Sequence, residues 1–389
     1  MDALMLPLNW QRVRLGDIGK PCMCKRVMKH QTTRYGEIPF YKIGTFGNTA
    51  DAFISKKLFL EYKTKYSFPK KGDILISASG TIGRAVIYDG KPAYFQDSNI
   101  VWIDNDETLV KNDFLFYAYS NVKWNTEHTT ILRLYNDNFR NTLIPLPPLD
   151  EQIAIANILS DLDRYLYSLD ALILKKESIK KALSFELLSQ RKRLKGFNQA
   201  WQRVRLEDIC EFGNGGAYET LIVENGDFKL ISLNSIDIDG NLKNTMKRVN
   251  FYDNSLKQDD IVMVLSDVAH GDFLGLCAVI PSNDYVLNQR MGRLRKKNDC
   301  INVLFLRLYI NANQKYFKMQ GQGSSQLNLS KKAIEDFEIL LPPLNEQIAI
   351  ANILNALDHE IISLKNKKRQ FENIKKALNH DLMSAKIRV

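Results

Sequence analysis

Apolar side chains recur at steps of three and four residues between residues 150 and 193, in a segment without proline or glycine. This spacing places them on one stripe of a long α-helix. The stripe consists of Ile155, Leu159, Leu162, Leu166, Leu169, Ile173, Ile179, Leu183 and Leu187. A second stripe has the same spacing and consists of Ile350, Leu354, Leu357, Ile361, Leu364, Phe371, Ile374, Leu378 and Leu382. The pattern predicts two long helices.

Both predicted helices have a defined start. Proline pairs at 147–148 and 342–343 disfavour helix before them, and Asp150 or Asn345 can cap the first turn. Gly196 is expected to end the first helix. A helix of some 43 residues is about 65 Å long, which is too long for a compact domain. The narrow apolar stripe therefore needs a partner, and the other helix is the nearest candidate.

The charges favour an antiparallel pair. Residues 150–171 carry five acidic and one basic side chain (−4), whereas 172–195 carry eight basic and two acidic (+6). The second copy repeats this order, with −3 over 342–363 and +6 over 364–389. Antiparallel pairing places the acidic front of each helix beside the basic rear of the other, and the helix dipoles agree. The alternative is two unrelated surface helices of separate domains.

The two helices belong to a tandem duplication. LPPLDEQIAIANIL at 146–159 returns as LPPLNEQIAIANIL at 341–354, with 13 of 14 positions identical. NWQRVRLGDI from Asn9 returns as AWQRVRLEDI from Ala200. The offsets are 195 and 191 residues, so the chain stops about where a third unit would begin. We expect a nearly circular molecule with a pseudo-twofold axis.

The segments between these anchors share little beyond a strand-like rhythm. Runs at 73–78, 262–265 and 278–280 read as strands among short helical stretches, so each body is predicted to be an α+β domain. The expected division is 1–148 and 196–343 for the two globular domains. The two spacer helices are expected within 149–195 and 344–389.

Composition narrows the class of protein. The chain has 389 residues, 45% of them apolar and 25% charged, and no apolar run approaches the roughly 18 residues of a membrane span. The five cysteines show no disulfide rhythm and no metal-ligand spacing. We expect a cytoplasmic protein without a metal site. The net charge of +10 permits a nucleic-acid partner.

In the first body, three stretches are candidates for DNA contact. SASGTIGR at 77–84 follows a predicted strand and offers small residues, hydroxyls and a cation, although a plain hairpin turn is the alternative. The other two are a basic cluster near residue 30, which solvent exposure alone would explain, and the polar loop at 126–134. The candidate residues are Arg26, Lys29, Arg34, Tyr35, Ser79, Thr81, Arg84, His128 and Thr129.

The second body has two such stretches. GQGSSQLNL at 321–329 matches the loop at 126–134 under the 195-residue offset, and its amides can donate to and accept from base edges. NQRMGRLRKK at 288–297 combines amides with five cations, although it also fits a soluble edge strand. The candidate residues are Asn288, Gln289, Arg290, Arg293, Gln322, Ser324, Ser325, Gln326 and Asn328.

The duplicated helix starts, the W-x-x-V-x-L-x-D-I openings at Trp10 and Trp201 and the half-chain period together resemble the specificity subunits of type I restriction-modification systems. The resemblance covers the whole chain. It implies that each body is a target recognition domain that reads one half of a bipartite site in double-stranded DNA. It also implies that the helices fix the spacing and dock the methyltransferase subunits. Docking residues are expected where the copies match best, at Glu151, Gln152, Ile155, Glu346, Gln347 and Ile350.

By the same resemblance, the partners are two modification subunits and two restriction subunits, which would use S-adenosylmethionine, ATP and Mg²⁺. This chain itself is expected to bind no cofactor. It has no phosphate-binding loop ending in Gly-Lys-Ser/Thr, no Asn-Pro-Pro-Tyr/Phe motif and no recognisable nucleophile signature, so no catalytic residue is assigned. Two rival hypotheses remain: a coiled-coil scaffold that binds only protein, and a self-contained nuclease or methyltransferase with an unrecognised site.

Overall fold

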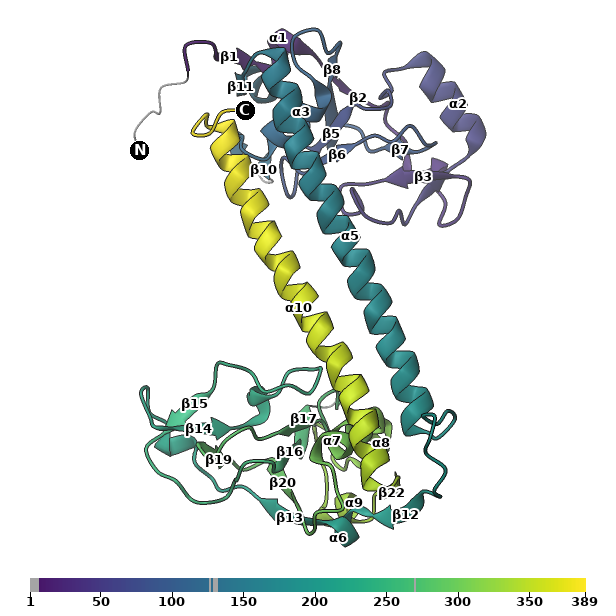
Figure 1. Ribbon diagram of the computed structural model, residues 1–389. Coiled ribbons are helices and arrows are strands. Elements are labelled where there is room, and N and C mark those ends of the chain that lie inside the picture. The colour runs from purple at the N-terminus through teal and green to yellow at the C-terminus, as the bar shows by residue number, and fades with distance from the viewer. Residues whose placement is uncertain (1–6, 126, 129–131, 269–270) are drawn as a thin grey trace. The chain divides into compact units, whose positions relative to one another are not determined.

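The computed structural model describes residues 7–125, 127–128, 132–268 and 271–389. The chain divides into two compact units, unit 1 with Met1–Asp170 and Asn366–Val389, and unit 2 with Ala171–Lys365. We call the globular part of unit 1 body 1 (residues 7–148) and that of unit 2 body 2 (residues 196–343). Each unit also holds one part of each long helix (Figure 1). No helix in the described ranges is both long and apolar enough to cross a membrane.

Body 1 is built on a four-stranded sheet in the order β2-β8-β5-β6 and a three-stranded sheet in the order β4-β3-β7. The first sheet contains β2 (Gly19–Met23), β8 (Ile100–Asn105), β5 (Ile74–Ser77) and β6 (Ala85–Ile87). The second contains β4 (Phe53–Ile54), β3 (Ile38–Tyr41) and β7 (Tyr94–Phe95). Two further pairs are β1 (Gln11–Arg14) with β11 (Leu143–Leu146), and β9 (Glu127–His128) with β10 (Leu132–Arg133). The helices are α1 (Leu15–Ile18), α2 (Lys56–Lys65), α3 (Asn112–Tyr119), α4 (Asn136–Asn141) and the 3₁₀ turn η1 (Lys29–Gln31).

Body 2 repeats this plan with the sheets β13-β20-β16-β18 and β15-β14-β19. Their strands are β13 (Cys210–Asn214), β20 (Met291–Lys296), β16 (Ile261–Val264), β18 (Cys277–Val279), β15 (Lys247–Val249), β14 (Phe228–Ile231) and β19 (Tyr285–Leu287). The further pairs are β12 (Gln202–Arg205) with β22 (Glu338–Leu341), and β17 (Ser266–Val268) with β21 (Gln326–Asn328). The helices are α6 (Leu206–Ile209), α7 (Val303–Ala312), α8 (Gln314–Gln320), α9 (Lys331–Glu335) and the 3₁₀ turns η2 (Glu219–Leu221) and η3 (Leu233–Ser235).

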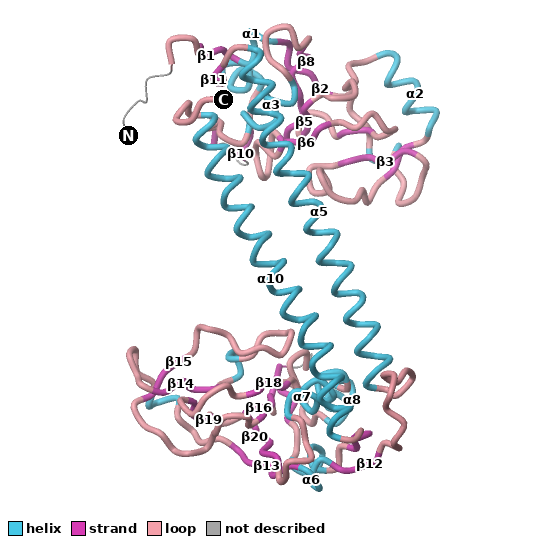
Figure 2. Tube along the Cα trace, viewed as in Figure 1, coloured by secondary structure: helices cyan, strands magenta, loops and turns pink. Residues whose placement is uncertain are grey.

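One inner strand of each larger sheet, β5 in body 1 and β16 in body 2, has the same apolar pattern although the two sequences differ. In β5, Ile74 and Ile76 enter one apolar cluster while Leu75 enters another, and all four residues of the strand are buried. In β16, Met263 and Val262 are likewise divided between two clusters. Side chains of a strand alternate between its two faces, so an unbroken apolar run forms a central strand. Strands mix with short helices and long loops in both bodies (Figure 2), which confirms the α+β prediction.

The two long helices are α5 (Leu149–Leu188) and α10 (Leu344–Met383), each of 40 residues. The prediction that the first runs to Arg193 and ends at Gly196 was wrong. Gln190 has a φ of 61° and Ala385, at the matching position after α10, has a φ of 56°. This left-handed conformation terminates a helix, so both helices stop at the same point of the repeat.

Within each unit the parts of α5 and α10 pair antiparallel, as the charges predicted. In unit 1, Lys375 and Lys368 of α10 pair with Asp163 and Asp170 of α5, the latter at 2.7 Å. In unit 2, Lys176 of α5 pairs with Glu360 of α10 at 2.8 Å, and Lys180 pairs with Asp358. Each of these bridges joins the acidic front of one helix to the basic rear of the other.

The predicted apolar stripe is correct over most of its length, with one error at a matched pair of positions. Leu169, Ile173 and Ile361 are buried on the helices. Ile179 and Ile374, which are 195 residues apart, are instead 38% and 42% exposed. The residues that follow them, Lys180 and Lys375, form ion pairs across the seam with Asp358 and Asp163, so charged side chains occupy the contact at this level.

The repeated Glu-Gln pair fastens each helix start to its own body. Gln152 accepts a hydrogen bond from the Lys111 backbone N–H at 2.9 Å and donates to the Leu109 and Pro147 carbonyls. In unit 2, Gln347 accepts from the Asn302 N–H at 2.9 Å and donates to the Cys300 and Pro342 carbonyls. The amide side chain satisfies three backbone groups in both copies, which accounts for its repetition.

The repeated tryptophan also bonds to the start of the long helix. Trp10 Nε1 donates to Glu151 and Trp201 Nε1 donates to Glu346, both at 3.0 Å. These bonds link the first strand pair of each body to the start of its long helix. The two most similar motifs of the sequence are therefore two sides of one structural joint.

Candidate nucleic-acid interface

Three segments that are far apart in the sequence meet at one end of the larger sheet in body 1. The Ala78 N–H donates to the Asn99 carbonyl, and the Leu134 N–H donates to the Ala78 carbonyl, both at 2.8 Å. Ser79 also forms an isolated bridge with Arg133. The loop after β5, the turn before β8 and the polar loop that ends at Leu134 thus form one surface.

The corresponding segments of body 2 meet in the same way. The Leu265 N–H donates to the Arg290 carbonyl at 3.0 Å, and the Leu329 N–H donates to the Leu265 carbonyl at 2.8 Å. Ser266 pairs with Asn328 in the β17–β21 ladder. In body 1, SASGTIGR therefore contacts the end of the polar loop at Arg133 and Leu134. In body 2, NQRMGRLRKK and GQGSSQLNL both bond to Leu265, which lies between them.

A fourth segment, between the first two long strands of each body, is tied to this surface. In body 1, Arg26 forms an ion pair with Asp97 at 2.9 Å. In body 2, Asn288 accepts from the Tyr218 N–H and donates to Glu219 at 2.9 Å. The chemistry differs, but the same two loops are joined.

The candidates in body 1 divide into those at this surface and those elsewhere. Ser79 is buried and donates to Asn99 at 2.8 Å, while Thr81 and Arg84 are exposed, with Arg84 donating to the Phe46 carbonyl. Lys29, Arg34 and Tyr35 are exposed, and no described contact joins them to the three loops. His128 lies in β9, and Thr129 lies outside the described residues.

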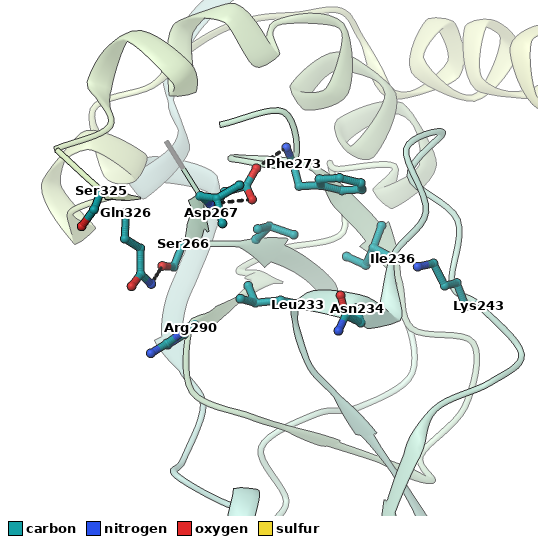
Figure 3. A pocket seen from close by; sticks show the side chains of 12 residues that line it. Leu233, Asn234, Ile236, Lys243, Ser266, Asp267, Phe273, Arg290, Ser325 and Gln326 are labelled. Atoms are coloured by element: carbon teal, nitrogen blue, oxygen red, sulfur yellow. Dashed lines mark hydrogen bonds between the residues drawn. The ribbon is translucent and has the colours of Figure 1, made fainter. Parts of the chain in front are cut away.

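Three of the candidates in body 2, Arg290, Ser325 and Gln326, line a pocket of about 400 Å³ (Figure 3), whose polar lining also includes Ser266. Gln326 donates to the neighbouring Ser266 at one side of it. Gln322, Ser324, Ser325 and Asn328 are exposed on the neighbouring loop. Asn288 is only 4% exposed, and the Arg293 guanidinium pairs with Glu211 at 2.6 Å, so both side chains are engaged within the body.

Sequence reasoning did not select several residues of these surfaces. Arg133 of body 1 donates to the Ser98 carbonyl and occupies the position of Asn328 under the 195-residue offset, so the repeat itself contained a signal for it. Asp267 accepts from the Val268 and Phe273 N–H groups and shapes the wall of the pocket (Figure 3). The Asp267 carboxylate bonds to backbone groups of its own loop here, and no periodic pattern in the sequence marks such a residue.

The predicted docking residues prove to be largely inaccessible. Gln152, Ile155, Gln347 and Ile350 are 1% exposed, and Glu346 is fully buried. Glu151 is half-buried against Trp10. Their repetition follows from the joint described above, and their role in docking stays a prediction.

Comparison with known proteins agrees with this architecture. The family described as "Type I restriction modification DNA specificity domain" matches residues 7–180 and again 198–373. The MjaVIII type I restriction enzyme specificity subunit of Methanocaldococcus jannaschii is 29% identical over 100% of this chain and 95% of its own. A type I restriction enzyme specificity subunit of Haemophilus influenzae is 64% identical over 148 residues, which is 38% of each chain.

A solved structure has the same fold. The S subunit of a type I restriction-modification system from M. genitalium superposes with a TM-score of 0.66 over 97% of this chain and 98% of its own, at 19% identity. Each of the two family matches contains one half of the duplication and one copy of the three-loop surface. The chain belongs to the family of type I restriction-modification DNA specificity subunits, and is the specificity component rather than a catalytic one.

Proposed function

We propose that body 1 and body 2 each read one half of a bipartite site in double-stranded DNA. The supporting observation is that two bodies of unlike sequence present the same three-loop surface, each fixed to a nearly identical joint. A duplicated frame with divergent loops suits two different base sequences. A scaffold that holds identical protein partners would instead favour matching loops.

In this proposal the helices fix the gap between the half-sites. Each helix contributes residues to both units and contains no proline or glycine. A continuous, paired helix is stiff, so it holds a defined separation. Duplex DNA repeats every 10 to 10.5 base pairs, roughly 34 Å, so a fixed separation selects a fixed number of unread base pairs.

Partner subunits would dock on the exposed apolar positions that the repeat preserves. These are Leu149 with Leu344, Ile153 with Ile348, and Ile179 with Ile374, all between 37% and 46% exposed. Matched positions in two copies suit two equal modification subunits, and two restriction subunits would complete the system. S-adenosylmethionine, ATP and Mg²⁺ belong to those partners in this proposal. No cluster of three His, Cys, Asp or Glu suited to a metal ion is present among the described residues.

The first experiment is selection from random duplex DNA by this chain co-expressed with its modification subunit, at physiological salt to suppress nonspecific phosphate binding. We expect a split motif with a fixed unread gap. Recovery of an intact complex without any enriched sequence would favour the scaffold. DNA cleavage or methylation by the purified chain alone would favour the self-contained enzyme.

The second experiment tests the spacing directly. Seven residues would be inserted into both helices at matched levels, between Asp170 and Ala171 and between Lys365 and Asn366. Seven residues lengthen a helix by about 10 Å, so the gap should grow by about three base pairs while both half-sites stay the same. The control carries the same seven residues in one helix only, which breaks the pairing. An unchanged gap in the double insertion would exclude the helices as the spacer.

A further inference from the structure

The basic run at the start of β20 contains five cations, and the structure separates one from the rest. Four of them are engaged within body 2. Their partners are Glu211 for Arg293 (2.6 Å), Asp260 for Arg295 (2.6 Å), Asp299 for Lys296 (2.8 Å) and the Glu207 carbonyl for Lys297 (2.5 Å). A guanidinium held by a carboxylate has few donors left for a base edge.

Arg290 is the exception. Its side chain is exposed and makes no hydrogen bond or ion pair within the described ranges, and Figure 3 draws it without a dashed line. The pKa of Glu219 is lowered first by a hydrogen bond from Gln289 and to a lesser degree by the Arg290 charge, so Arg290 acts on this carboxylate through its charge and not through a bond. The full donor set of Arg290 therefore remains available.

The backbone at Arg290 is fixed within the three-loop surface. Its φ is 67°, in the left-handed region that non-glycine residues rarely adopt. Hydrogen bonds fix the turn on both sides, from the Leu265 N–H to the Arg290 carbonyl and from the Gln289 N–H to the Gly216 carbonyl. Such conformations persist where the surrounding structure enforces them, and they concentrate at functional sites.

Arg290 also lies between two pockets of body 2. Both the pocket of about 400 Å³ and a neighbour of about 330 Å³ are lined by Arg290 and Ser266. Gln326 and Ser325 add an amide and a hydroxyl on the first side, where Figure 3 shows them on the same side of the pocket as Arg290. Gln289 and Asn328 add two amides on the second side. Lys243 and Asp267 also line the first pocket, and Lys331, which pairs with Glu335 at 3.5 Å, also lines the second. Arg290 is the cation that both pockets share, and the amides beside it can donate to and accept from a base edge.

We propose that Arg290 is a specificity-determining residue that donates two hydrogen bonds to O6 and N7 of a guanine in the half-site read by body 2. The planar guanidinium fork matches those two acceptors in the major groove, which no other base presents together. This inference rests on the proposed function, and it names one base class that body 2 requires.

The test repeats the DNA selection with the full chain and its modification subunit for the wild type, Arg290→Ala and Arg290→Lys. We expect the wild-type motif to contain one G·C position whose preference falls by about 10- to 100-fold in Arg290→Ala. Arg290→Lys should not restore it, because lysine lacks the fork. The half-site read by body 1 serves as an internal control and should not change.

Lys296→Ala is the matched control, since it removes a cation of the same run that pairs with Asp299. It should leave both half-sites unchanged, and equal melting temperatures would show that all variants are folded. A uniform weakening for every sequence, restored by Arg290→Lys, would assign Arg290 to a phosphate and overturn the inference. An unchanged motif in Arg290→Ala would overturn it as well. Only a wild type that selects no split motif would reject the proposed function itself.

Discussion

Units 1 and 2 keep the same helix pairing with different chemistry at one level of the seam. In unit 1 the rings of Tyr165 and Phe371 pack with centroids 4.7 Å apart. The positions related to them by the 195-residue repeat are Glu360 and Lys176 of unit 2, which form an ion pair at 2.8 Å. The repeat therefore preserves which positions face each other and leaves open how they attract each other.

At the neighbouring contact of the seam the chemistry is identical in both units. Asp163 pairs with Lys375 in unit 1, and the matching Asp358 pairs with Lys180 in unit 2. These two bridges fix the direction of pairing, because a parallel arrangement would place like charges together. The Asp-Lys positions therefore specify the antiparallel direction, whereas the neighbouring positions only need a favourable contact of some kind.

The joints differ in a similar way. Glu346 is fully buried between Trp201 and the bidentate guanidinium of Arg193. The matching Glu151 is half-buried against Trp10, while Arg388, which corresponds to Arg193, donates to Asn9 at 2.5 Å. The same residues thus form a closed joint in one unit and a looser one in the other.

The largest expected effect is at these joints. Glu346→Ala leaves the Trp201 N–H and a guanidinium without their buried acceptor, so we expect a loss of about 3 kcal/mol in the free energy of unfolding. Glu151→Ala removes one hydrogen bond at a half-buried site and should cost about 1 kcal/mol. Urea unfolding of both variants measures the difference. Equal losses would mean that the Arg193 contact contributes nothing to unit 2.

The second effect concerns a buried aspartate that occupies the same loop in both bodies. Asp260 accepts from the Lys257 N–H and holds Arg295, so Asp260→Asn should cost about 2 kcal/mol because the arginine loses its charged partner. Asp73 accepts from the Lys70 N–H without an arginine, and burial raises the pKa of its carboxyl. Asp73→Asn should therefore be neutral or stabilising at pH 7.

The effect of Asp73→Asn on stability should also depend on pH. Because folding raises the pKa of Asp73, its protonated form is favoured in the folded state, and that contribution is lost as pH rises through the raised value. The difference between wild type and Asp73→Asn should be largest above the folded pKa and should shrink toward pH 4, near the unfolded value. Thermal melting between pH 4 and pH 7 checks this. A constant difference over that range would contradict the role assigned to burial.

The smallest effects are in the helix seam. Phe371→Ala removes a ring pair and part of an apolar contact, and should cost about 1.5 kcal/mol at any salt concentration. Lys176→Ala removes a partly exposed ion pair and should cost about 0.5 kcal/mol, falling further in 1 M salt. Unfolding at low and high salt distinguishes the two. A salt-independent loss for Lys176→Ala would show that its aliphatic chain, and not its charge, supports the seam.

The sequence by itself determined the features that depend on neighbouring residues. Periodicity gave two long helices, the charge order gave their antiparallel pairing, and the repeat gave two α+β bodies with matched joints. These signals are local or directly duplicated, so they can be read without a structure. Even so, the predicted end of the first helix was wrong. The helix stops because Gln190 adopts a left-handed backbone conformation, which a glutamine in the sequence does not predict.

Only the tertiary structure decided which polar residues are available. Arg290, Arg293 and Arg295 are equivalent cations in the sequence, yet two of them are held by Glu211 and Asp260, 82 and 35 residues away. Likewise, the repetition of Gln152 and Gln347 predicted docking residues, yet both are 1% exposed and bond to the backbone of their own body. Strand register brings such distant partners together, and no local pattern encodes it. The availability of a side chain for a ligand is therefore a property of the folded body.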